Sequence, residues 1–401
     1  MRALAAQLEG KKWAHLNSTF EGGGVAEILK SAVPITRGLG IECEWHCMEG
    51  DEAFFVTTKK MHNAIQGVEI EFSQEELFDR YLGTAKRNFS GQTIDADFTL
   101  VHDPQPCPAI IYGAFEGKVI WRCHIDTTAA NELIWDFLLP YINNYDGAVF
   151  SHRAFLRGGV NAPRYIIPPA IDPLSFKNRR RSRREALTQL GDLFTEYDID
   201  GDRPVILAVS RYDVHKNQAA IVAAFKNLKQ HKVFREKKPQ LIIVGNLATD
   251  DPEGAGMYAK IVTQIDDDPD IYALLNIPDN DKNIGALMSL AEVFVHISTK
   301  EGFGLVVTEA LWQGTPVIGS RVGGITLQVR DGESGFLVHP NEIDKITDHM
   351  AYFLTHREER EKMGLAAREH VKNNFLMTGL VKNYLMLMRH SLGLGKPHFA
   401  V

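Results

Sequence analysis

Cysteine is scarce in this chain of 401 residues: there are four, at positions 43, 47, 107 and 123, and none forms a C-x-x-C pair. We also predict no secretory signal, because Met1–Lys12 contains an acidic residue and too short an apolar run. We therefore expect free, buried thiols in a protein of the reducing cytoplasm. Cys43, His46 and Cys47 could supply three zinc ligands, but no second cluster completes such a site, so we predict no metal site.

Long hydrophobic runs are also missing: no stretch approaches about 18 uninterrupted apolar residues, so we predict no membrane-spanning segment. The net charge is −7, which argues against nucleic acid as the main partner. One basic cluster stands out, and we expect it to form a solvated charged face. Its members are Lys177, Arg179, Arg180, Arg181, Arg183 and Arg184.

Several catalytic patterns are absent. There is no Ser/His/Asp triad, no G-x-S-x-G turn, no Walker A loop and no G-x-G-x-x-G. We predict no tightly bound cofactor. A D-x-D-type carboxylate pair is not evident either, so dependence on magnesium stays open. Asp198, Asp200 and Asp202 alternate in an acidic loop, but they lack the spacing of a calcium loop, and we expect them to be solvated.

What is present is the composition of a globular protein, with 44% hydrophobic and 24% charged residues, long enough for two or three domains. Short apolar runs alternate with helical patterns, which is typical of parallel βαβ units. The predicted strands of the first half are Lys12–Asn17, Phe98–His102, Val119–His124, Gly147–Ser151 and Tyr165–Ile167. Those of the second half are Val205–Ser210, Leu241–Gly245, Ala273–Asn276, Val293–Ile297, Pro316–Gly319 and Gly335–Val338, before a helical segment over 343–392.

A proline-rich segment separates the halves. Three prolines in the six residues 168–173 remove backbone donors, so this segment reads as a linker. We therefore predict an N-terminal domain over 1–167, a second domain over 174–375, and a C-terminal helix over 376–401 that packs back on the first domain. Because open parallel sheets bind ligands at the carboxyl ends of their strands, we look for the chemistry there.

Three strand ends carry groups suited to an anion. Gly22, Gly23 and Gly24 follow the first predicted strand, where they could form either a tight turn or a phosphate or sugar site. Arg211 and Lys216 follow the Val205–Ser210 strand, and two fixed cations there suit a diphosphate better than an ordinary surface loop.

The third strand end carries two carboxylates. Glu301 and Glu309 flank Gly302–Gly304, whose backbone amides would lie at a helix N-terminus. Eight residues of helix would separate the carboxylates by about 12 Å along the axis, more than the acid/base pair of a glycoside hydrolase allows. We expect them to hold different parts of one extended ligand. His124 lies at the end of its predicted strand and Asp103 directly follows one, although each residue could equally be structural.

Together these residues resemble a known family. The E-x(7)-E spacing of Glu301 and Glu309, with Arg211 and Lys216, is similar to the retaining family-4 glycosyltransferases of GT-B architecture. Finer motifs resemble the trehalose glycosyltransferring synthases within that family. These are His15–Thr19, Gly22–Leu29, Thr58–Gly67, His102–Pro106, Trp121–Asp126 and Gly323–Gln328. Many members have a glutamate near the end of the last motif, where this chain has Gln328. The resemblance also implies a leading segment that this sequence lacks, which leaves a truncated start open.

The resemblance implies an α/β fold of two Rossmann-like parallel-sheet domains that face each other across a deep cleft. It implies catalytic roles for Arg211 and Lys216 at the nucleotide diphosphate, for Glu301 at the glucose hydroxyls, and for His124 near the 6-hydroxyl. The donor would also contact Gly22, Gly23, Gly24, Gly302, Phe303, Gly304, Leu305 and, through its ribose, Glu309. The acceptor sugar would face Asp103 and Gln105, with His62, Asn63 and Gln66 nearby.

The activity implied is transfer of glucose from UDP-glucose or ADP-glucose to glucose, with retention, giving α,α-trehalose. A retaining trehalose phosphorylase and a related transferase with another sugar acceptor remain alternatives. The partners expected are a nucleotide sugar, a small sugar acceptor and, from the resemblance, a second copy in a homodimer. The sequence does not fix the preferred nucleotide base.

Overall fold

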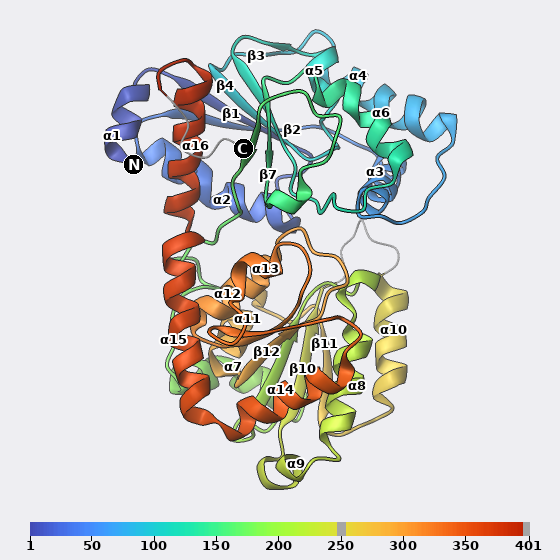
Figure 1. The fold of residues 1–401 in the computed structure, drawn as a ribbon, viewed down its shortest axis with the longest axis vertical. Helices are drawn as coiled ribbons and strands as arrows, with labels where there is room; N and C mark the ends of the chain where they lie inside the picture. The colour runs from blue at the N-terminus through green and yellow to red at the C-terminus, as the bar shows by residue number, and fades with distance from the viewer. Residues whose placement is uncertain (247–253, 396–401) are drawn as a thin grey trace. The chain divides into compact units, whose positions relative to one another are not determined.

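The computed structural model describes residues 1–246 and 254–395, and its contacts divide the chain into two α/β units (Figure 1). Unit 1 consists of residues 1–170 together with the C-terminal residues from Met377 onward, and unit 2 consists of Ile171–Leu376. The first boundary falls inside the proline-rich segment, where few backbone donors are available to continue a sheet or a helix. The second falls at the start of the last helix.

Unit 1 is built on a parallel sheet of six strands in the order β2-β1-β4-β6-β7-β8. Its strands are β1 (Lys12–Asn17), β2 (Glu42–Cys47), β4 (Phe98–His102), β6 (Lys118–Arg122), β7 (Gly147–Phe150) and β8 (Arg164–Ile166). A separate two-stranded pair joins β3 (Thr93–Ile94) and β5 (Ala114–Phe115). The register pairs His15 with Leu100 and His102 with Arg122, so neighbouring strands end at a common edge.

Helices cover both faces of this sheet. On one face the C-terminal helix α16 (Met377–Ser391) packs against α2 (Gly23–Gly38) and the short α1 (Arg2–Ala5). The other face carries the main core of the unit. It is covered by α3 (Glu52–Ile65), the π-helix η2 (Glu75–Leu82), α4 (Gly83–Phe89), α5 (Ala109–Tyr112) and α6 (Glu132–Ile142). Short 3-10 turns lie at Ala6–Leu8 and Arg153–Phe155.

Unit 2 repeats the plan with the strand order β11-β10-β9-β12-β13-β14, again all parallel. The strands are β9 (Val205–Val209), β10 (Gln240–Gly245), β11 (Ile271–Leu275), β12 (Val293–His296), β13 (Val317–Ser320) and β14 (Gly335–Val338). The helices are α7 (Arg183–Glu196), α8 (Gln218–Leu228), α9 (Lys232–Lys237), α10 (Gly254–Ile265), α11 (Asn280–Leu290), α12 (Leu305–Gln313), α13 (Ile325–Gln328), α14 (Ile343–Thr355) and α15 (Arg357–Asn374), with a 3-10 turn at Val214–Lys216.

The pleat of β9 shows how this sheet builds two cores. Val205, Leu207 and Val209 face the core shared with α7, α11, α12 and α15. Ile206 and Ala208 face the opposite core, which is shared with α8, α10 and α14. A strand that is buried on both faces reads as a continuous apolar run, which is why the sequence of this sheet could be recognised.

The fold class predicted from the sequence is confirmed, since each unit holds a doubly wound parallel sheet, and the predicted strands lie within two residues of the observed ones. Strand β2 was missed because its sequence, Glu-Cys-Glu-Trp-His-Cys, lacks an apolar run. The segment over 343–392 is not one continuous helix: α14 ends at Thr355, α15 ends at Asn374, and α16 begins at Met377.

The predicted thiol state also holds: the four cysteines are free, with Cys43, Cys107 and Cys123 buried and Cys47 half-buried. The acidic residues Asp198, Asp200 and Asp202 are exposed, as expected.

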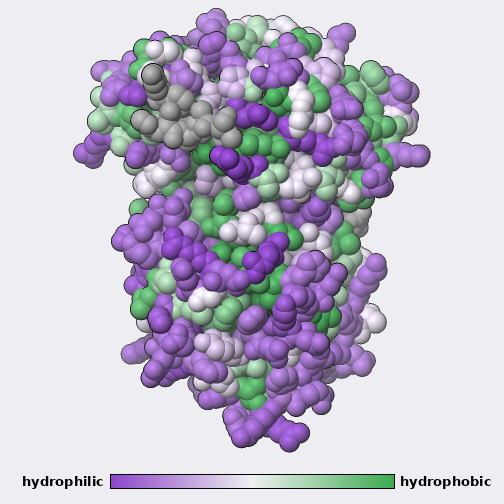
Figure 2. Space-filling model, in the orientation of Figure 1, coloured by the Kyte–Doolittle hydropathy of each residue, from purple (hydrophilic) through white to green (hydrophobic). Residues whose placement is uncertain are grey.

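Hydrophilic side chains cover most of the face that Figure 2 shows, with smaller hydrophobic areas between them. Across residues 1–246 and 254–395, no helix combines the length and the apolar character needed to cross a membrane.

Candidate functional site

The chain reverses its direction of winding after the second strand of the sheet in unit 1 and after the third strand in unit 2. The reversal lies between β1 and β4 in unit 1, and between β9 and β12 in unit 2. The loops that leave two such neighbouring strands diverge, which opens the place where doubly wound sheets bind ligands. The glycine loop after β1, the Arg211 and Lys216 loop after β9, and Glu301 after β12 lie at these two places. Each unit is described here by itself.

In unit 2 the loop after β9 carries Lys216 to Glu301, which lies after β12. The Lys216 Nζ and the Glu301 Oε2 are 2.7 Å apart. His296 Nε2 lies 2.8 Å and Ser298 Oγ 3.1 Å from the same carboxylate oxygen. One oxygen of Glu301 therefore faces three donors. Lys216 comes from the loop after β9, whereas His296 ends β12 and Ser298 follows it. Arg211 lies in the same loop with an exposed side chain.

The charge state of Glu301 follows from these contacts. Burial alone would raise the pKa of this carboxyl, but the Lys216 ammonium and the His296 hydrogen bond outweigh burial and hold the pKa well below its usual range. Glu301 is therefore an anion throughout the physiological pH range. A Lys216 ammonium has three donors, so the contact with Glu301 leaves two for a ligand.

The turn after Glu301 exposes backbone amides. In the described part of the chain, the amides of Gly302, Phe303 and Gly304 donate to no acceptor. Gly304 has φ +81° and is the N-cap of α12, so the turn directs these amides at the helix N-terminus, where a partial positive charge favours an anion or a hydroxyl oxygen. Leu305 begins the helix.

Gln328 fixes this turn from behind. Its side chain is fully buried, and its amide nitrogen donates to the carbonyl oxygens of Phe303 and Gly324. Its amide oxygen accepts from the Thr308 hydroxyl. A Cβ at Gly324 would lie 2.5 Å from the Phe303 Cα, so the glycine is needed for this close approach. Gln328 therefore ties the glycine loop to α12 and α13.

The second carboxylate of the motif has its own partner. Glu309 lies within α12, is fully buried, and has an oxygen 2.8 Å from the Lys177 Nζ. The prediction that Lys177 belongs to a solvated basic face is therefore wrong. The segment that carries Lys177 crosses α12, where the Trp312 indole donates to the Asn178 carbonyl at 3.1 Å, and this packing buries the ammonium. Arg179, Arg180, Arg183 and Arg184 are exposed as expected, and Arg181 is half-buried.

In unit 1 the glycine loop follows β1. Gly22 and Gly23 have φ +73°, a conformation that favours glycine, and α2 begins at Gly23. The loop is held at its start by the Asn17 side chain, whose amide donates to the Thr19 carbonyl at 2.9 Å. The loop, including Gly24, is exposed, so its backbone is accessible to a ligand.

Next to this loop, three histidines form a row across the ends of β1, β4 and β6. His15 Nδ1 lies 3.0 Å from His102 Nε2, and His102 Nδ1 lies 3.0 Å from His124 Nε2. Neighbouring rings meet edge to edge through these nitrogens, with centroids 5.3 Å apart and interplanar angles of 24° and 25°. His15 and His102 are buried, while His124 is half-buried. Of the three, only His124 was assigned a role from the sequence.

Asp103 lies beside this row. Its carboxylate accepts from the His124 backbone amide at 2.7 Å, and its own backbone has φ +62°. Burial raises the pKa of Asp103 to about 7, although the His124 amide and the Arg122 guanidinium both favour the carboxylate. In the same loop the Gln105 Oε1 is buried and has no hydrogen-bond partner among the described residues. These two groups are suited to accept hydrogen bonds from sugar hydroxyls.

The remaining predicted acceptor residues lie at the end of α3. His62 and Asn63 are in its last turn and Gln66 is its C-cap. This end contacts the loop that follows His124, since the Asn131 amide donates to the Ala64 carbonyl at 2.9 Å. The structure thus brings the end of α3 against the same loop region as His124.

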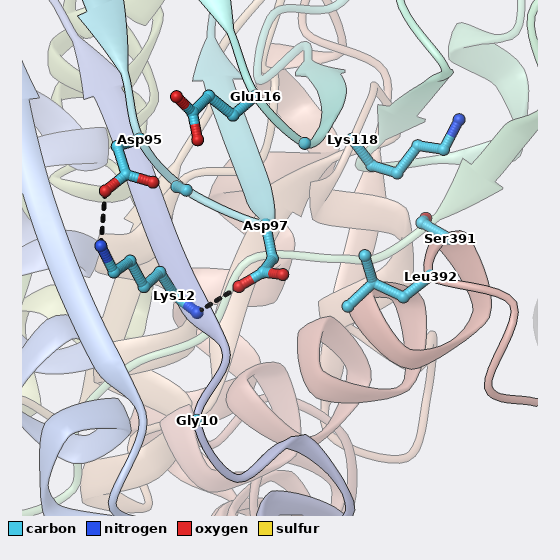
Figure 3. Close-up of a pocket in the computed structure, with 10 residues that line it drawn as sticks. Gly10, Lys12, Asp95, Asp97, Glu116, Lys118, Ser391 and Leu392 are labelled. Atoms are coloured by element: carbon cyan, nitrogen blue, oxygen red, sulfur yellow. Dashed lines mark hydrogen bonds and ion pairs between the residues drawn. The ribbon is translucent and has the colours of Figure 1, made fainter.

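A separate hollow of unit 1 lies far from these groups, at the amino ends of β1, β4 and β6 (Figure 3). Its volume is about 550 Å³. Lys12 contacts Asp95 through its ammonium and Asp97 through its backbone amide, and Lys11 pairs with Asp97 at 2.8 Å. Its acidic side chains are thus largely matched by lysines, and parallel sheets do not bind ligands at this edge. Within the described ranges, no group of three or more histidine, cysteine or acidic side chains could hold a metal ion.

Comparison with known proteins fits this geometry. The sequence model of a family described as "Trehalose synthase, N-terminal domain" matches residues 15–157, and that of "Glycosyl transferases group 1" matches residues 192–370. A trehalose synthase of Rubrobacter xylanophilus is 39% identical over 404 residues, covering 98% of this chain and 94% of that protein. The chain belongs to the trehalose synthase family.

Two further likenesses are more distant. A trehalose phosphorylase of Pleurotus pulmonarius is 27% identical, covering 96% of this chain and 58% of that protein. The structure of an α,α-trehalose-phosphate synthase from Burkholderia xenovorans has a TM-score of 0.75 at 14% identity, covering 95% of this chain and all of that one, and so shares its GT-B fold. As a member of the trehalose synthase family, the chain is a trehalose-related hexosyltransferase.

Sequence reasoning missed His15, His102, His296, Ser298 and the pairing of Lys177 with Glu309. The histidines had a usable signal, because each is a polar residue in or at the end of a largely apolar strand, where a buried polar group needs a hydrogen-bond partner. Lys177 had none: its partner lies more than a hundred residues away in the sequence, and only packing brings them together.

The Gly304 turn gives a stability prediction. A Gly304→Ala variant places a side chain at φ +81° and a Cβ 3.2 Å from Glu301 Cγ and Cδ. We expect it to lose about 1–2 kcal/mol and to disturb the Glu301 carboxylate. Gly191→Ala in α7, where a Cβ meets nothing within 4 Å, is the control and is expected to gain about 0.5–1 kcal/mol. Chemical denaturation of both variants measures this, and equal midpoints would contradict it.

Proposed function

We propose that the chain transfers glucose from a nucleoside-diphosphate glucose, UDP-glucose or ADP-glucose, to the anomeric hydroxyl of glucose with retention, and so forms α,α-trehalose. The observation that carries this proposal is the Lys216–Glu301 pair beside the unused amides of residues 302–304. This arrangement combines a cation for a phosphate, an anion for sugar hydroxyls and amides for either, as a nucleotide sugar requires.

Unit 2 would hold the donor. Arg211 and the two spare donors of Lys216 neutralise the diphosphate. Glu301 accepts from the glucose hydroxyls because it stays ionised, and the amides of Gly302, Phe303 and Gly304 donate to them. The family resemblance assigns the ribose hydroxyls to Glu309, whose buried carboxylate is held by the Lys177 ammonium in the structure.

Unit 1 would hold the reacting hexoses. Asp103 and Gln105 accept from hydroxyls of the acceptor, with His62, Asn63 and Gln66 at the end of α3 as further contacts. His124 contacts the transferred glucose at its 6-hydroxyl. No phosphate-binding cluster accompanies these residues in the described loops, which favours an acceptor without phosphate.

The reaction then balances without a protein nucleophile. The bond from glucose C1 to the β-phosphate oxygen breaks, and the acceptor hydroxyl oxygen bonds to C1 on the same face. The acceptor proton passes to the leaving phosphate oxygen, and the nucleoside diphosphate departs. Lys216 and Arg211 lower the barrier because they stabilise the charge that develops on the leaving phosphate.

Proton NMR of the product tests the proposal. With glucose and either UDP-glucose or ADP-glucose, we expect the single anomeric signal of symmetric α,α-trehalose, in amounts equal to the nucleotide released. Omitting glucose should stop nucleotide release. Consumption of trehalose with inorganic phosphate in the absence of any nucleotide would instead establish a phosphorylase, which the likeness to the Pleurotus enzyme makes the second candidate.

Removal of the central cation should stop turnover. We expect Lys216→Ala to lower kcat about 10²- to 10³-fold, since one preorganised charge at the leaving group is lost. Lys232→Ala, whose side chain is 88% exposed in α9, is the control and should keep the activity of the original protein. Initial rates with circular dichroism of both variants measure this. Undiminished activity of a folded Lys216→Ala protein would exclude the proposed role.

The raised pKa of Asp103 predicts a pH dependence. Because only the carboxylate accepts fully from acceptor hydroxyls, kcat/KM for glucose should rise as the pH increases and level off above about pH 7. In Asp103→Asn this step should disappear and kcat/KM should be low at every pH. The measurement is kcat/KM for glucose at saturating donor between about pH 6 and pH 8. An unchanged step in Asp103→Asn would show that another group titrates.

A further inference from the structure

The row His15, His102, His124 is closed at one end and open at the other. At the closed end, His15 Nε2 is buried and has no partner among the described residues, and the Trp13 ring covers the His15 ring at 4.7 Å. At the open end, His124 is half-buried, and its Nδ1 makes no hydrogen bond to the described residues. The row therefore leads from the core of unit 1 to the group proposed to contact the transferred glucose.

The three rings are neutral at neutral pH. Burial lowers the pKa of His15 to about 3. It also lowers the pKa of His102 and of His124 well below the usual range, and the Arg122 guanidinium adds to the effect in both cases. A neutral imidazole has one N–H donor and one lone pair.

This neutrality couples the tautomers. Each link of the row needs one donor and one acceptor, so the middle ring, His102, must accept from one neighbour and donate to the other. Either all three rings carry the proton on Nδ1, or all three carry it on Nε2. The tautomer of His15 in the core therefore fixes the tautomer of His124 at the open end of the row.

The closed end decides between the two states. With the protons on Nε2, His15 would place an N–H in the core with no acceptor, beside Trp13, whose own indole N–H is buried without one. With the protons on Nδ1, His15 leaves a lone pair there, and the buried end then holds one donor and one acceptor rather than two unmatched donors. The Nδ1–H state is favoured. A proton could not be passed inward either, since nothing among the described residues receives it at His15.

We propose that His15 and His102 are positioning residues that lock His124 in its Nδ1–H tautomer, so that His124 presents a neutral hydrogen-bond donor to a hydroxyl oxygen of the transferred hexose. The binding part of this inference rests on the proposed function. The row acts as a fixed dipole chain rather than as a proton relay. His124 then selects an oxygen that accepts a hydrogen bond.

The test is nitrogen NMR of the full chain with labelled histidine, without ligand. We expect His15, His102 and His124 all to show protonated Nδ1 and unprotonated Nε2 at neutral pH. His102→Phe keeps a ring but removes both nitrogens, so His124 should become a mixture of tautomers. His102→Gln, which can still donate to one neighbour and accept from the other, should restore the lock in part. His356→Phe, at an exposed position of unit 2, is the control and should leave the three signals unchanged.

The outcomes separate the two proposals. A protonated Nε2 on His124 in the original protein, or the same tautomer in His102→Phe, would overturn the lock whatever the protein's activity. If His102→Phe does not fold, His15→Phe removes the hydrogen bond at the closed end of the row and serves as the second variant.

With the nucleotide glucose that supports turnover, the His124 Nδ1–H signal should shift, whereas the nucleoside diphosphate alone should leave it in place. KM for that donor should rise about 3- to 10-fold in His102→Phe, with less effect on kcat. A shift produced equally by the nucleoside diphosphate would overturn the hexose contact, and absence of turnover with any donor would overturn the proposed function alone.

Discussion

Parallel winding with a reversal of direction determines where polar groups can gather in this protein. In each sheet the core is largely apolar on both faces, so most polar side chains are accommodated where strands end. The reversal separates the two loops at the centre of that edge and leaves their backbone accessible. Lys216 and Glu301 lie at this place in unit 2, and Gly22 and His102 lie at it in unit 1. The arrangement of the candidate site follows from the topology before any side chain is considered.

The two acidic groups at these places show how the surroundings assign chemical roles. Glu301 and Asp103 are both largely removed from water, which alone would raise the pKa of each. Glu301 meets an ammonium, an imidazole and a hydroxyl, and these donors keep it ionised. Asp103 receives one backbone amide, which does not compensate for burial, so its pKa rises to about 7. A permanent anion suits the proposed donor site, whereas a group that titrates near neutrality would make the proposed acceptor binding sensitive to pH.

Much of this could be predicted from the sequence, for physical reasons that can be stated. Strands such as β9 and β12 were recognisable because burial on both faces demands continuous apolar runs. Lys216, Glu301 and Gly304 were recognisable because local spacing fixes their position at strand ends. Strand β2 has no such run, since it lies at the edge of its sheet and has mixed residues. The pairing of Lys177 with Glu309 depends on the path of a distant segment over α12, and no local pattern encodes it.

Arg122 links these parts of unit 1. It ends β6, is fully buried, and donates to the Tyr384 hydroxyl at 3.1 Å and to the Ile167 carbonyl at 2.7 Å. A buried guanidinium must have acceptors, so α16 is held against the strand end whose next residues include His124. The same charge disfavours protonation of His102 and His124. Arg122 has no carboxylate partner among these contacts, and it has two effects. It anchors the returning C-terminal helix, and it helps keep the histidine row neutral. Neutral rings are the condition under which all the hydrogen bonds of the row run in one direction.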